Sequence, residues 1–581
     1  MANCTDTNSP IALLLRSGGH SPEANRLPEM LDFFGIPWAE LTISEAKAGG
    51  AASLIAGHSR FSILTSAPCL AETLEPGKAG VLPGWLTEAA SVFVYGFQTT
   101  DACRNLLREI SGDPEANIRS LDARPTKVSV ADDFPEICGP MSGVQMQLEP
   151  GADTVLTMRR AGGDFQSIVS APEGHLFAEF HRGGARFFCD ASQKMADIHR
   201  RTATYFDVKK SFSGTVPIVM YLKWAFRDIC WTTKETSACL IIDDPLLQPR
   251  YGSLDFLELL QLMNKHTFAS TIALIPWNWR RTDRGTVAAF QRNNEKLSIC
   301  VHGCDHTGGE FATRSTEVLN RKLKTASHRM NSLLERTGLH HDKVMIFPQG
   351  KFSPEAGLAL KGNGFAAAVN TEVAPANHDC NETTIADLWS VAILRYAGFA
   401  IFTRRYIAHG IENFAFDGLL GKPCFVVVHH ELFRDHGSKL SEFLEKLNSL
   451  NWKLRWRTLG NAVCHNYSIQ RRDGMNKVKM FAEQLVIENT EENTEPAPQQ
   501  MMVSKEEPDI AAVKGVTVNQ EPVDYEYAGG CLRFMVQVPP MGTAEIRCTY
   551  REQVNLSTRS EPISYKLKVA ARRYLSEFRD K

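Results

Sequence analysis

Residues 238–245 are Ala-Cys-Leu-Ile-Ile-Asp-Asp-Pro, a short apolar run that ends in two adjacent carboxylates. An apolar run of this length is typical of a strand that is buried in a parallel sheet. Such a strand delivers the residues at its end to the carboxyl-end rim, where barrels of alternating strands and helices carry their sites. The sequence therefore predicts that Asp243 and Asp244 lie at such a rim.

A second cluster follows another apolar run, because residues 297–306 are Leu-Ser-Ile-Cys-Val-His-Gly-Cys-Asp-His. Two imidazoles four residues apart can face one side of a tight loop, and with one carboxylate they form a three-ligand site that leaves positions open for water. We expect Asp244, His302 and His306 to bind one metal ion. Asp243 is then free to act as general base. Paired acids and an isolated His-x-x-x-His more often lie on a solvated surface or have a structural role. The metal site is favoured here because all four residues directly follow predicted buried strands.

Four segments, taken in order, resemble the polysaccharide deacetylases of the NodB-homology type, the family 4 carbohydrate esterases. The first family motif, a strand ending in Asp-Asp, resembles residues 242–244, and the second, His-Ser/Thr-x-x-His, resembles residues 302–306 with glycine in the hydroxyl position. The third resembles residues 347–350, Phe-Pro-Gln-Gly, and the last, a strand ending in His-Asp, resembles residues 425–431, Phe-Val-Val-Val-His-His-Glu. The resemblance covers residues 237–465.

The resemblance implies an enzyme that uses zinc, or another divalent transition metal, to remove acetyl groups from an N-acetylated sugar. In the implied mechanism, Asp243 takes a proton from a water activated by zinc, and the hydroxide attacks the acetamide carbonyl. A histidine of the pair His429 and His430 protonates the departing amine. If the family's strand-His-Asp motif is aligned by the length of its strand, its histidine falls on His429. If the motif is aligned by its Asp, which then matches Glu431, its histidine falls on His430.

The family's third motif also contains an arginine that orients the base, and this chain has none there. Lys351, Arg404 and Arg405 are the candidates to replace it. Substrate contacts are predicted for four residues: Trp277, Pro348, Gln349 and Arg404. A tryptophan near a rim can stack on a sugar face, but packing of its own loop is an equally good interpretation.

The fold expected from these patterns is α/β with three folded parts and a terminal helix. Alternating strands and helices over residues 231–466 predict a (β/α) barrel, of the distorted kind that the resemblance implies. Residues 1–230 predict a doubly wound parallel sheet with a β-rich extension. This part loosely resembles the glutamine amidotransferases, although Gln98 stands at the position of their nucleophilic cysteine, so no chemistry is expected there. A small β-sandwich is predicted over residues 467–560, and a helix over residues 561–581.

The sequence also predicts the role of the sandwich and the environment of two arginines in the terminal helix. The sandwich lacks an aromatic cluster, which favours a structural role over glycan binding. In the terminal helix, Arg572 and Arg573 are expected to be solvated rather than part of a binding patch.

Composition excludes several classes of protein. The formal net charge is −2 over 581 residues, so no bulk field attracts nucleic acid or an acidic membrane. The first residues lack a charged segment, and the apolar run at residues 11–15 is too short for a signal sequence or a membrane span, so a cytoplasmic protein is expected. The 14 cysteines are scattered, which favours reduced, buried thiols over disulfides.

Two functions from different classes follow, both with a carbohydrate as the partner. The leading one is a metal-dependent hydrolase that removes N-acetyl or other acyl groups from a glycan or glycoconjugate containing amino sugars. The alternative is a non-catalytic carbohydrate-binding or regulatory protein on a decayed deacetylase scaffold, motivated by the missing third-motif arginine and the absent export signal. A hydrolase of another C–N bond is a third option. The oligomeric state is left open by the sequence.

Overall fold

The computed structural model describes most of the chain: residues 10–17, 25–56, 58–74, 82–121, 126–149, 154–158, 165–376, 383–489, 498–551 and 562–580. The first residues, on which the expected lack of an export signal rests, and the predicted boundary at residue 560 lie outside these ranges. The chain divides into two compact units. The first comprises Met1–Arg200, Phe206–Thr232 and Gln470–Gly474, and the second comprises the rest. The predicted domain boundaries stay predictions.

The first unit is built on one mixed sheet with the strand order β2-β1-β3-β4-β11-β10-β9-β6-β7. Its first four strands and β11 run parallel, as the apolar runs of the sequence predict. The β-rich extension joins the same sheet through antiparallel pairs, so the sheet is mixed rather than wholly parallel. Its elements include β1 (Ile11–Arg16), α1 (Arg26–Phe34), β2 (Trp38–Thr42), β3 (Phe61–Ser66), β4 (Ser91–Tyr95), β6 (Thr126–Val130), β7 (Gln145–Leu148), β9 (Gln166–Ala171), β10 (Gly174–Arg182), β11 (Ala185–Asp190) and α9 (Val216–Ala225).

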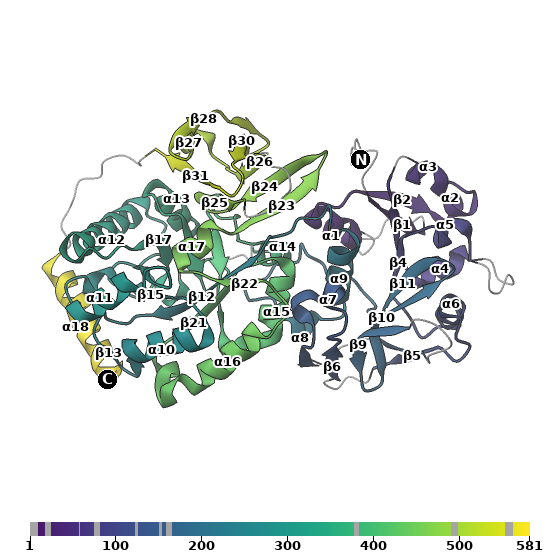
Figure 1. The fold of residues 1–581 in the computed structure, drawn as a ribbon, viewed down its shortest axis with the longest axis horizontal. Helices are drawn as coiled ribbons and strands as arrows, with labels where there is room; N and C mark the ends of the chain where they lie inside the picture. The colour runs from purple at the N-terminus through teal and green to yellow at the C-terminus, as the bar shows by residue number, and fades with distance from the viewer. Residues whose placement is uncertain are drawn as a thin grey trace. The chain divides into compact units, whose positions relative to one another are not determined.

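A parallel barrel forms the centre of the second unit, and its central strand is β12 (Thr236–Asp243), in which every residue is buried. The strand order is β19-β18-β17-β16-β15-β12-β21-β20 (Figure 1). Helices α10, α11, α12 and α13 lie outside these strands (Figure 1). These elements are α10 (Phe256–His266), β15 (Ser270–Leu274), α11 (Arg284–Arg292), β16 (Leu297–His302), α12 (Thr316–Thr337), β17 (Asp342–Ile346), α13 (Pro354–Gly362), β18 (Ala367–Asn370), β19 (Ile401–Thr403), β20 (Arg405–Tyr406) and β21 (Cys424–Val428). The predicted (β/α) barrel is confirmed.

The two edge strands of this barrel sheet are consecutive in the chain. Strand β19 pairs with β18 at one edge, and β20 pairs with β21 at the other. Only Arg404 separates the two strands, so the segment from Ile401 to Tyr406 bridges both edges and nearly closes the barrel. Arg404 is thereby fixed at the rim where β12 ends.

A β-sandwich follows the barrel, as the alternating pattern predicts. Sheets with the orders β23-β24-β26-β30-β29 and β25-β31-β27-β28 share one apolar core that includes Val478, Leu485, Val503, Phe534 and Ile546. The strands are β23 (Tyr467–Arg472), β24 (Met475–Met480), β25 (Gln484–Glu488), β26 (Gln499–Glu506), β27 (Val513–Val518), β28 (Glu521–Val523), β29 (Glu526–Ala528), β30 (Cys531–Val538) and β31 (Thr543–Tyr550).

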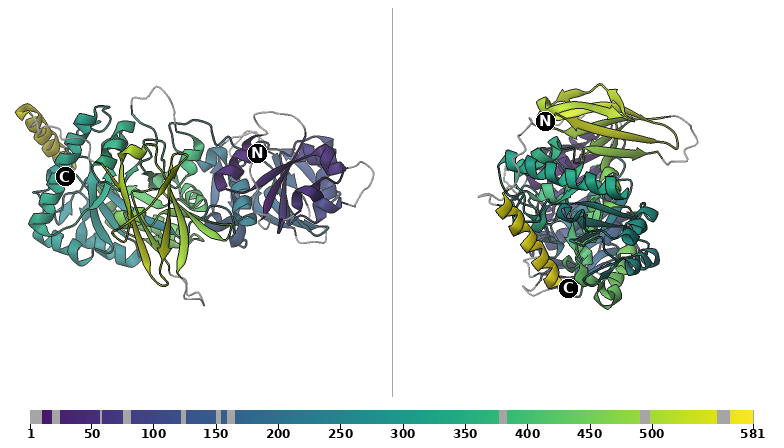
Figure 2. Two further views of the ribbon diagram at one scale, coloured as in Figure 1. Left: turned by 90° about the horizontal axis from the view of Figure 1, so that it is seen from above. Right: turned by 90° about the vertical axis from the view of Figure 1, so that its left-hand side faces the viewer.

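The terminal helix, α18 (Ile563–Asp580), is drawn in yellow beside the barrel in both views of Figure 2. Among the described residues, no helix combines the length and the apolar character that a membrane crossing needs. Each cysteine in the described ranges is free, as expected.

Candidate metal centre

Three predicted ligands meet at the carboxyl-end rim of the barrel. Asp244 directly follows β12, His302 ends β16, and His306 lies four residues further on. The Nε2 atoms of His302 and His306 lie 3.4 and 3.3 Å from Oδ1 of Asp244. One ligand atom from each residue can be chosen so that all three lie within 4.8 Å of one another. This arrangement can hold one metal ion.

The donor atoms suit a divalent transition metal. Oδ1 of Asp244 is buried and has no hydrogen-bond partner among the described residues, so it is left for another ligand. Nδ1 of His302 lies 3.0 Å from the carbonyl oxygen of Ile346. A carbonyl only accepts, so this nitrogen carries the proton and Nε2 offers its lone pair toward Asp244. Two imidazole nitrogens and one carboxylate oxygen are a common donor set for zinc at sites that keep a position open for water.

The ionisation of His306 and Asp244 also favours metal binding. Burial, together with the neighbouring His302, lowers the pKa of His306 to about 4, so its imidazole is neutral near pH 7. Burial raises the pKa of Asp244, but the two neighbouring histidines, His302 and His306, outweigh burial and hold this pKa well below its usual range. Neutral imidazole and ionised carboxylate are the forms that bind metal.

The backbone around the ligands is held in sparsely populated conformations. Asp244 and His306 have positive φ values of 78° and 54°. Gly303 has a φ of 64°, and a Cβ there would lie 2.3 Å from both Oε1 of Glu310 and Cγ of Pro348. Only glycine suits this position, which explains why no hydroxyl residue stands at this point of the motif. Strain of this kind persists where the surrounding structure enforces it, typically at functional sites.

Glu310 holds the loop that carries His306. Its Oε1 accepts hydrogen bonds from the backbone N–H groups of Cys304, at 2.8 Å, and His306, at 3.1 Å, and its Oε2 accepts one from Asp305 at 3.2 Å. Asp305 is itself buried and pairs with Lys322 and Arg329 at 2.6 and 2.7 Å. The sequence analysis missed this role of Glu310, and its only signal is an acidic residue shortly after the His-x-x-x-His pattern.

Asp243 lies next to the ligand triad and is paired with Arg404. Nη1 and Nη2 of Arg404 donate one hydrogen bond to each carboxylate oxygen, both at 2.7 Å. Both side chains are buried, with 4% and 2% of their surface exposed. Burial opposes ionisation of Asp243, but the charge of Arg404 outweighs it and lowers the pKa of Asp243. Of the three candidates for the missing motif arginine, Arg404 makes this contact, whereas Arg405 pairs with Asp417.

The two histidines after β21 point to different surroundings. His429 is half-buried, stacks on Tyr406 with 6.2 Å between ring centroids, and acts electrostatically on both carboxylates of the site. His430 is buried against Tyr251, 5.4 Å away edge-to-face, and its Nδ1 is 3.5 Å from the backbone nitrogen of Ser253. The assignment of the acid stays a prediction.

The other predicted substrate contacts lie around the same rim. Pro348 is buried and would meet any side chain at Gly303, and Gln349 is exposed with a φ of 57°. Trp277 is half-buried and packs edge-to-face on Tyr574 of α18, with ring centroids 6.0 Å apart. This contact is with another element and not with its own loop, so the substrate-binding role of Trp277 stays a prediction.

Helix α18 brings a residue to the site for which the sequence analysis predicted a different environment. Arg573 is only 7% exposed, and its Nη2 lies 3.4 Å from Nδ1 of His306. The expectation that Arg573 is solvated is therefore wrong. The face of this helix that packs on the barrel is mostly polar, whereas its large apolar side chains are exposed.

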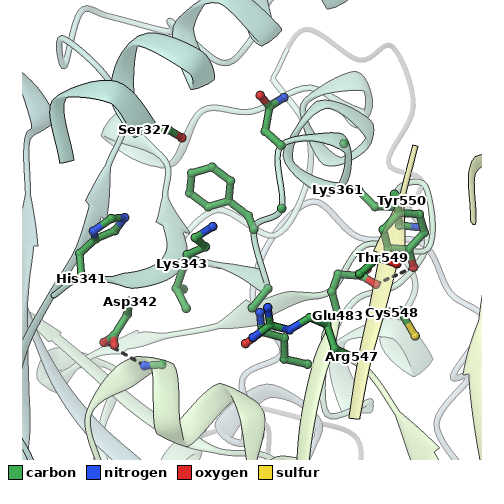
Figure 3. Close-up of a pocket in the computed structure, with 18 of the residues that line it drawn as sticks. Ser327, His341, Asp342, Lys343, Lys361, Glu483, Arg547, Cys548, Thr549 and Tyr550 are labelled. Carbon is green, nitrogen blue, oxygen red and sulfur yellow. Dashed lines mark hydrogen bonds between the residues drawn. The ribbon is translucent and has the colours of Figure 1, made fainter. Parts of the chain in front are cut away.

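A cavity of about 900 Å³ lies beside the amino end of β17, and Figure 3 shows the residues that line it. It is lined by the start of β17, by α12, and by strands of the sandwich, and Lys343 and Arg547 are among its basic residues. Glu483 in its wall accepts a hydrogen bond from the Tyr550 hydroxyl at 2.6 Å. None of the predicted site residues lines this cavity.

The fold and the site define a near-closed parallel barrel with an Asp-His-His cluster at its carboxyl-end rim. Among solved structures, the chain is similar to Agd3, described as a novel carbohydrate deacetylase, with 12% identity over 93% of this chain and 98% of that one and a TM-score of 0.49. A putative polysaccharide deacetylase from Mycobacterium smegmatis is 14% identical over 39% of this chain and 88% of its own, with a TM-score of 0.27. A family 4 carbohydrate esterase from Streptomyces lividans, in complex with acetate, is 12% identical over 37% and 90%, with a TM-score of 0.23.

No family model and no curated protein matches the sequence. The resemblance of the N-terminal part to glutamine amidotransferases stays a prediction.

Proposed function

We propose that this protein is a divalent-metal-dependent hydrolase that removes acetyl groups from the amino sugars of a glycan or glycoconjugate. The observation that carries the proposal is the buried pair of Asp243 and Arg404 directly beside Asp244 and its two histidines. The pair supplies an ionised carboxylate. The triad supplies three metal ligands, which leaves coordination positions of the metal open for water or substrate.

The ligand triad is Asp244, His302 and His306. An ion held there would polarise the acetamide carbonyl and make a nearby water more acidic. Asp243 accepts the proton of that water, because Arg404 keeps its carboxylate ionised and fixes its orientation. Each oxygen of Asp243 accepts one N–H from Arg404 and retains a further acceptor position for the proton.

The half-buried His429 is the proposed acid that protonates the departing amine. Hydrolysis then adds hydroxide to the acyl carbon and a proton to the nitrogen, so acetate and a free amino sugar leave the site. Either imidazole nitrogen could deliver this proton, since no hydrogen bond of the described residues occupies the ring.

The alternative function, a binding protein on a decayed scaffold, was motivated by the missing third-motif arginine. Arg404 provides the contact that such an arginine would make, from a segment that directly follows β19. That motivation is thereby weakened.

The test is release of acetate by the zinc-loaded protein from a panel of N-acetylated oligosaccharides, compared with Asp243→Asn. We expect the variant to keep stoichiometric zinc and to lose about two or more orders of magnitude in turnover. Glu442→Gln, at an exposed position of α16 (Ser438–Asn448), is the matched control and should behave as the wild type. A wild-type protein that binds no zinc, or an Asp243→Asn variant with unchanged turnover, would contradict the proposal.

A further inference from the structure

Helix α18 is attached to the barrel by its polar face. Five large apolar side chains of this helix are exposed, each by 58% or more: Ile563, Leu567, Tyr574, Leu575 and Phe578. Of the α18 residues whose side chains are described, Val569 and Arg573 are buried. A surface helix normally buries its apolar stripe, so this orientation is set by specific polar contacts and not by apolar burial.

Two contacts fix the helix at either end of its buried face. Near its start, the Tyr565 hydroxyl lies 3.0 Å from Oδ2 of Asp305 and accepts a hydrogen bond from Lys322. Near its end, Glu577 accepts hydrogen bonds from both terminal nitrogens of Arg281, one of them at 2.6 Å. Asp305 belongs to the loop between the two ligand histidines, so the helix is fastened to the metal-centre loop itself.

Arg573 lies between these anchors and is almost unpartnered. Among the described residues, the polar atoms within hydrogen-bonding range of its guanidinium are Nδ1 of His306 and Oγ of Ser576, both at 3.4 Å. Its Nε is buried without a partner, and no ion pair of the described residues includes it. The carboxylates of Asp244 and Glu577 act on this cation only from beyond ion-pair distance. Burial of a cation without an anion in contact is unfavourable, so the arrangement calls for a negatively charged partner.

His306 adds a second donor aimed at the same place. Ligation through Nε2 requires that the proton of its imidazole sits on Nδ1. Nδ1 and the nearest guanidinium nitrogen of Arg573 are then two donors 3.4 Å apart with no acceptor between them. An oxygen of an anionic group can accept from both, and charge-assisted bonds of this kind are the strong ones.

We propose that Arg573 and Nδ1–H of His306 form a carboxylate-binding subsite beside the metal centre. The inference rests on the proposed function, which it extends to the class of ligand. The carboxylate belongs either to an acidic sugar next to the N-acetylated one or to the acetate that the reaction releases.

The test compares Arg573→Gln and Arg573→Lys with Lys568→Gln, which removes one charge at an exposed position of the same helix. The zinc-loaded proteins are titrated calorimetrically with acetate, and with a neutral N-acetylglucosamine oligomer and its 6-carboxylated counterpart. We expect Arg573→Gln to weaken binding of a carboxylate probe by about tenfold or more, to leave the neutral oligomer unaffected, and to retain zinc. Arg573→Lys should restore part of the loss, and Lys568→Gln should match the wild type.

The outcomes separate the two sources of the carboxylate. If the wild type binds the carboxylated oligomer more tightly than the neutral one, the carboxylate belongs to an acidic sugar. If it binds both oligomers equally, and acetate binding depends on Arg573, the carboxylate belongs to the acetate that is released. If no oligosaccharide releases acetate, the proposed function fails, but Arg573-dependent acetate binding still supports the subsite. Equal binding of every probe by the wild type and Arg573→Gln overturns the subsite. Faster turnover of the neutral oligomer by Arg573→Gln also overturns it, because the arginine would then only obstruct the site.

Discussion

Arg404 and Asp243 form a two-point pair in which each guanidinium nitrogen donates to its own carboxylate oxygen at 2.7 Å. The planar fork of arginine matches a carboxylate in this geometry, which a lysine cannot reproduce. Arg404 also separates the two edge strands β19 and β20, so one residue both joins the edges of the barrel and orients the proposed base.

Replacing Arg404 by methionine should strongly destabilise the protein. The variant leaves the carboxylate of Asp243 buried without its counter-charge, and removal of one partner of a buried pair costs about 3–5 kcal/mol. Urea unfolding at pH 7 measures the change in the free energy of unfolding. Arg395→Met is the control, because Arg395 forms an exposed pair with Asp387 at 2.8 Å and should lose about 1 kcal/mol or less.

The loss of unfolding free energy caused by Arg404→Met should become smaller as the pH falls. The pKa of Asp243 is lowered in the folded protein, so its ionisation contributes stability above its unfolded pKa of about 3.9, and that contribution disappears as the pH falls through the folded pKa. In Arg404→Met, burial loses its largest opposing effect, the charge of Arg404, and raises the pKa of Asp243 above its unfolded value. The difference in unfolding free energy between wild type and variant should therefore shrink as the pH falls, first through the raised pKa of Asp243 in the variant, above about pH 4, and then through its lowered pKa in the wild type. A difference that is constant from pH 7 to pH 3 would contradict the pairing.

Zinc should stabilise the wild type but not variants of its ligands. A ligand that binds only the folded state at a free concentration 100 times its Kd adds about 2.7 kcal/mol. We expect Asp244→Asn and His306→Ala to abolish most of this gain, measured as the shift in unfolding midpoint between zinc and chelator. His340→Ala, at an exposed histidine, should retain the full zinc-dependent shift. Equal shifts in all four proteins would place the metal elsewhere.

Gly303→Ser should damage the metal centre although serine is a family residue at this point of the motif. The new Cβ would lie 2.3 Å from Glu310 and from Pro348, and the φ of 64° is unfavourable for any side chain. We expect a loss of about 2 kcal/mol or more in unfolding free energy, together with weaker zinc binding. The control is Gly529→Ser, where φ is 58° but nothing lies within 4 Å of the added Cβ. Only backbone strain should lower the stability of this variant. Similar losses in both variants would show that strain, and not overlap, decides the effect.

The sequence could predict the metal ligands because they directly follow buried apolar strands, and parallel strands bring their carboxyl ends to one rim. Arg404 could only be placed among three candidates, since its contact with Asp243 depends on how the barrel closes. The β-rich extension of the first sheet was predicted but its antiparallel pairing was not, because alternation of apolar residues does not encode which strand is the neighbour. Arg573 was misjudged because amphipathic patterning predicts an inward apolar face, and in α18 polar contacts override it.

The last prediction distinguishes His429 from His430 as the proposed acid. His429 is half-buried, and its charge acts on both Asp243 and Asp244, whereas His430 is only 6% exposed. His429→Ala should therefore retain zinc and lose about two or more orders of magnitude in turnover, because protonation of the leaving amine is removed.

His430→Ala should instead lower the free energy of unfolding by about 1–3 kcal/mol, since it removes a buried ring that packs on Tyr251. Its turnover at saturating substrate should stay within about tenfold of the wild type. Acetate release, zinc content and urea unfolding, measured on both variants, check the assignment. If His430→Ala abolishes turnover while His429→Ala retains it, the acid is His430. The acidic residue of the family motif then corresponds to Glu431.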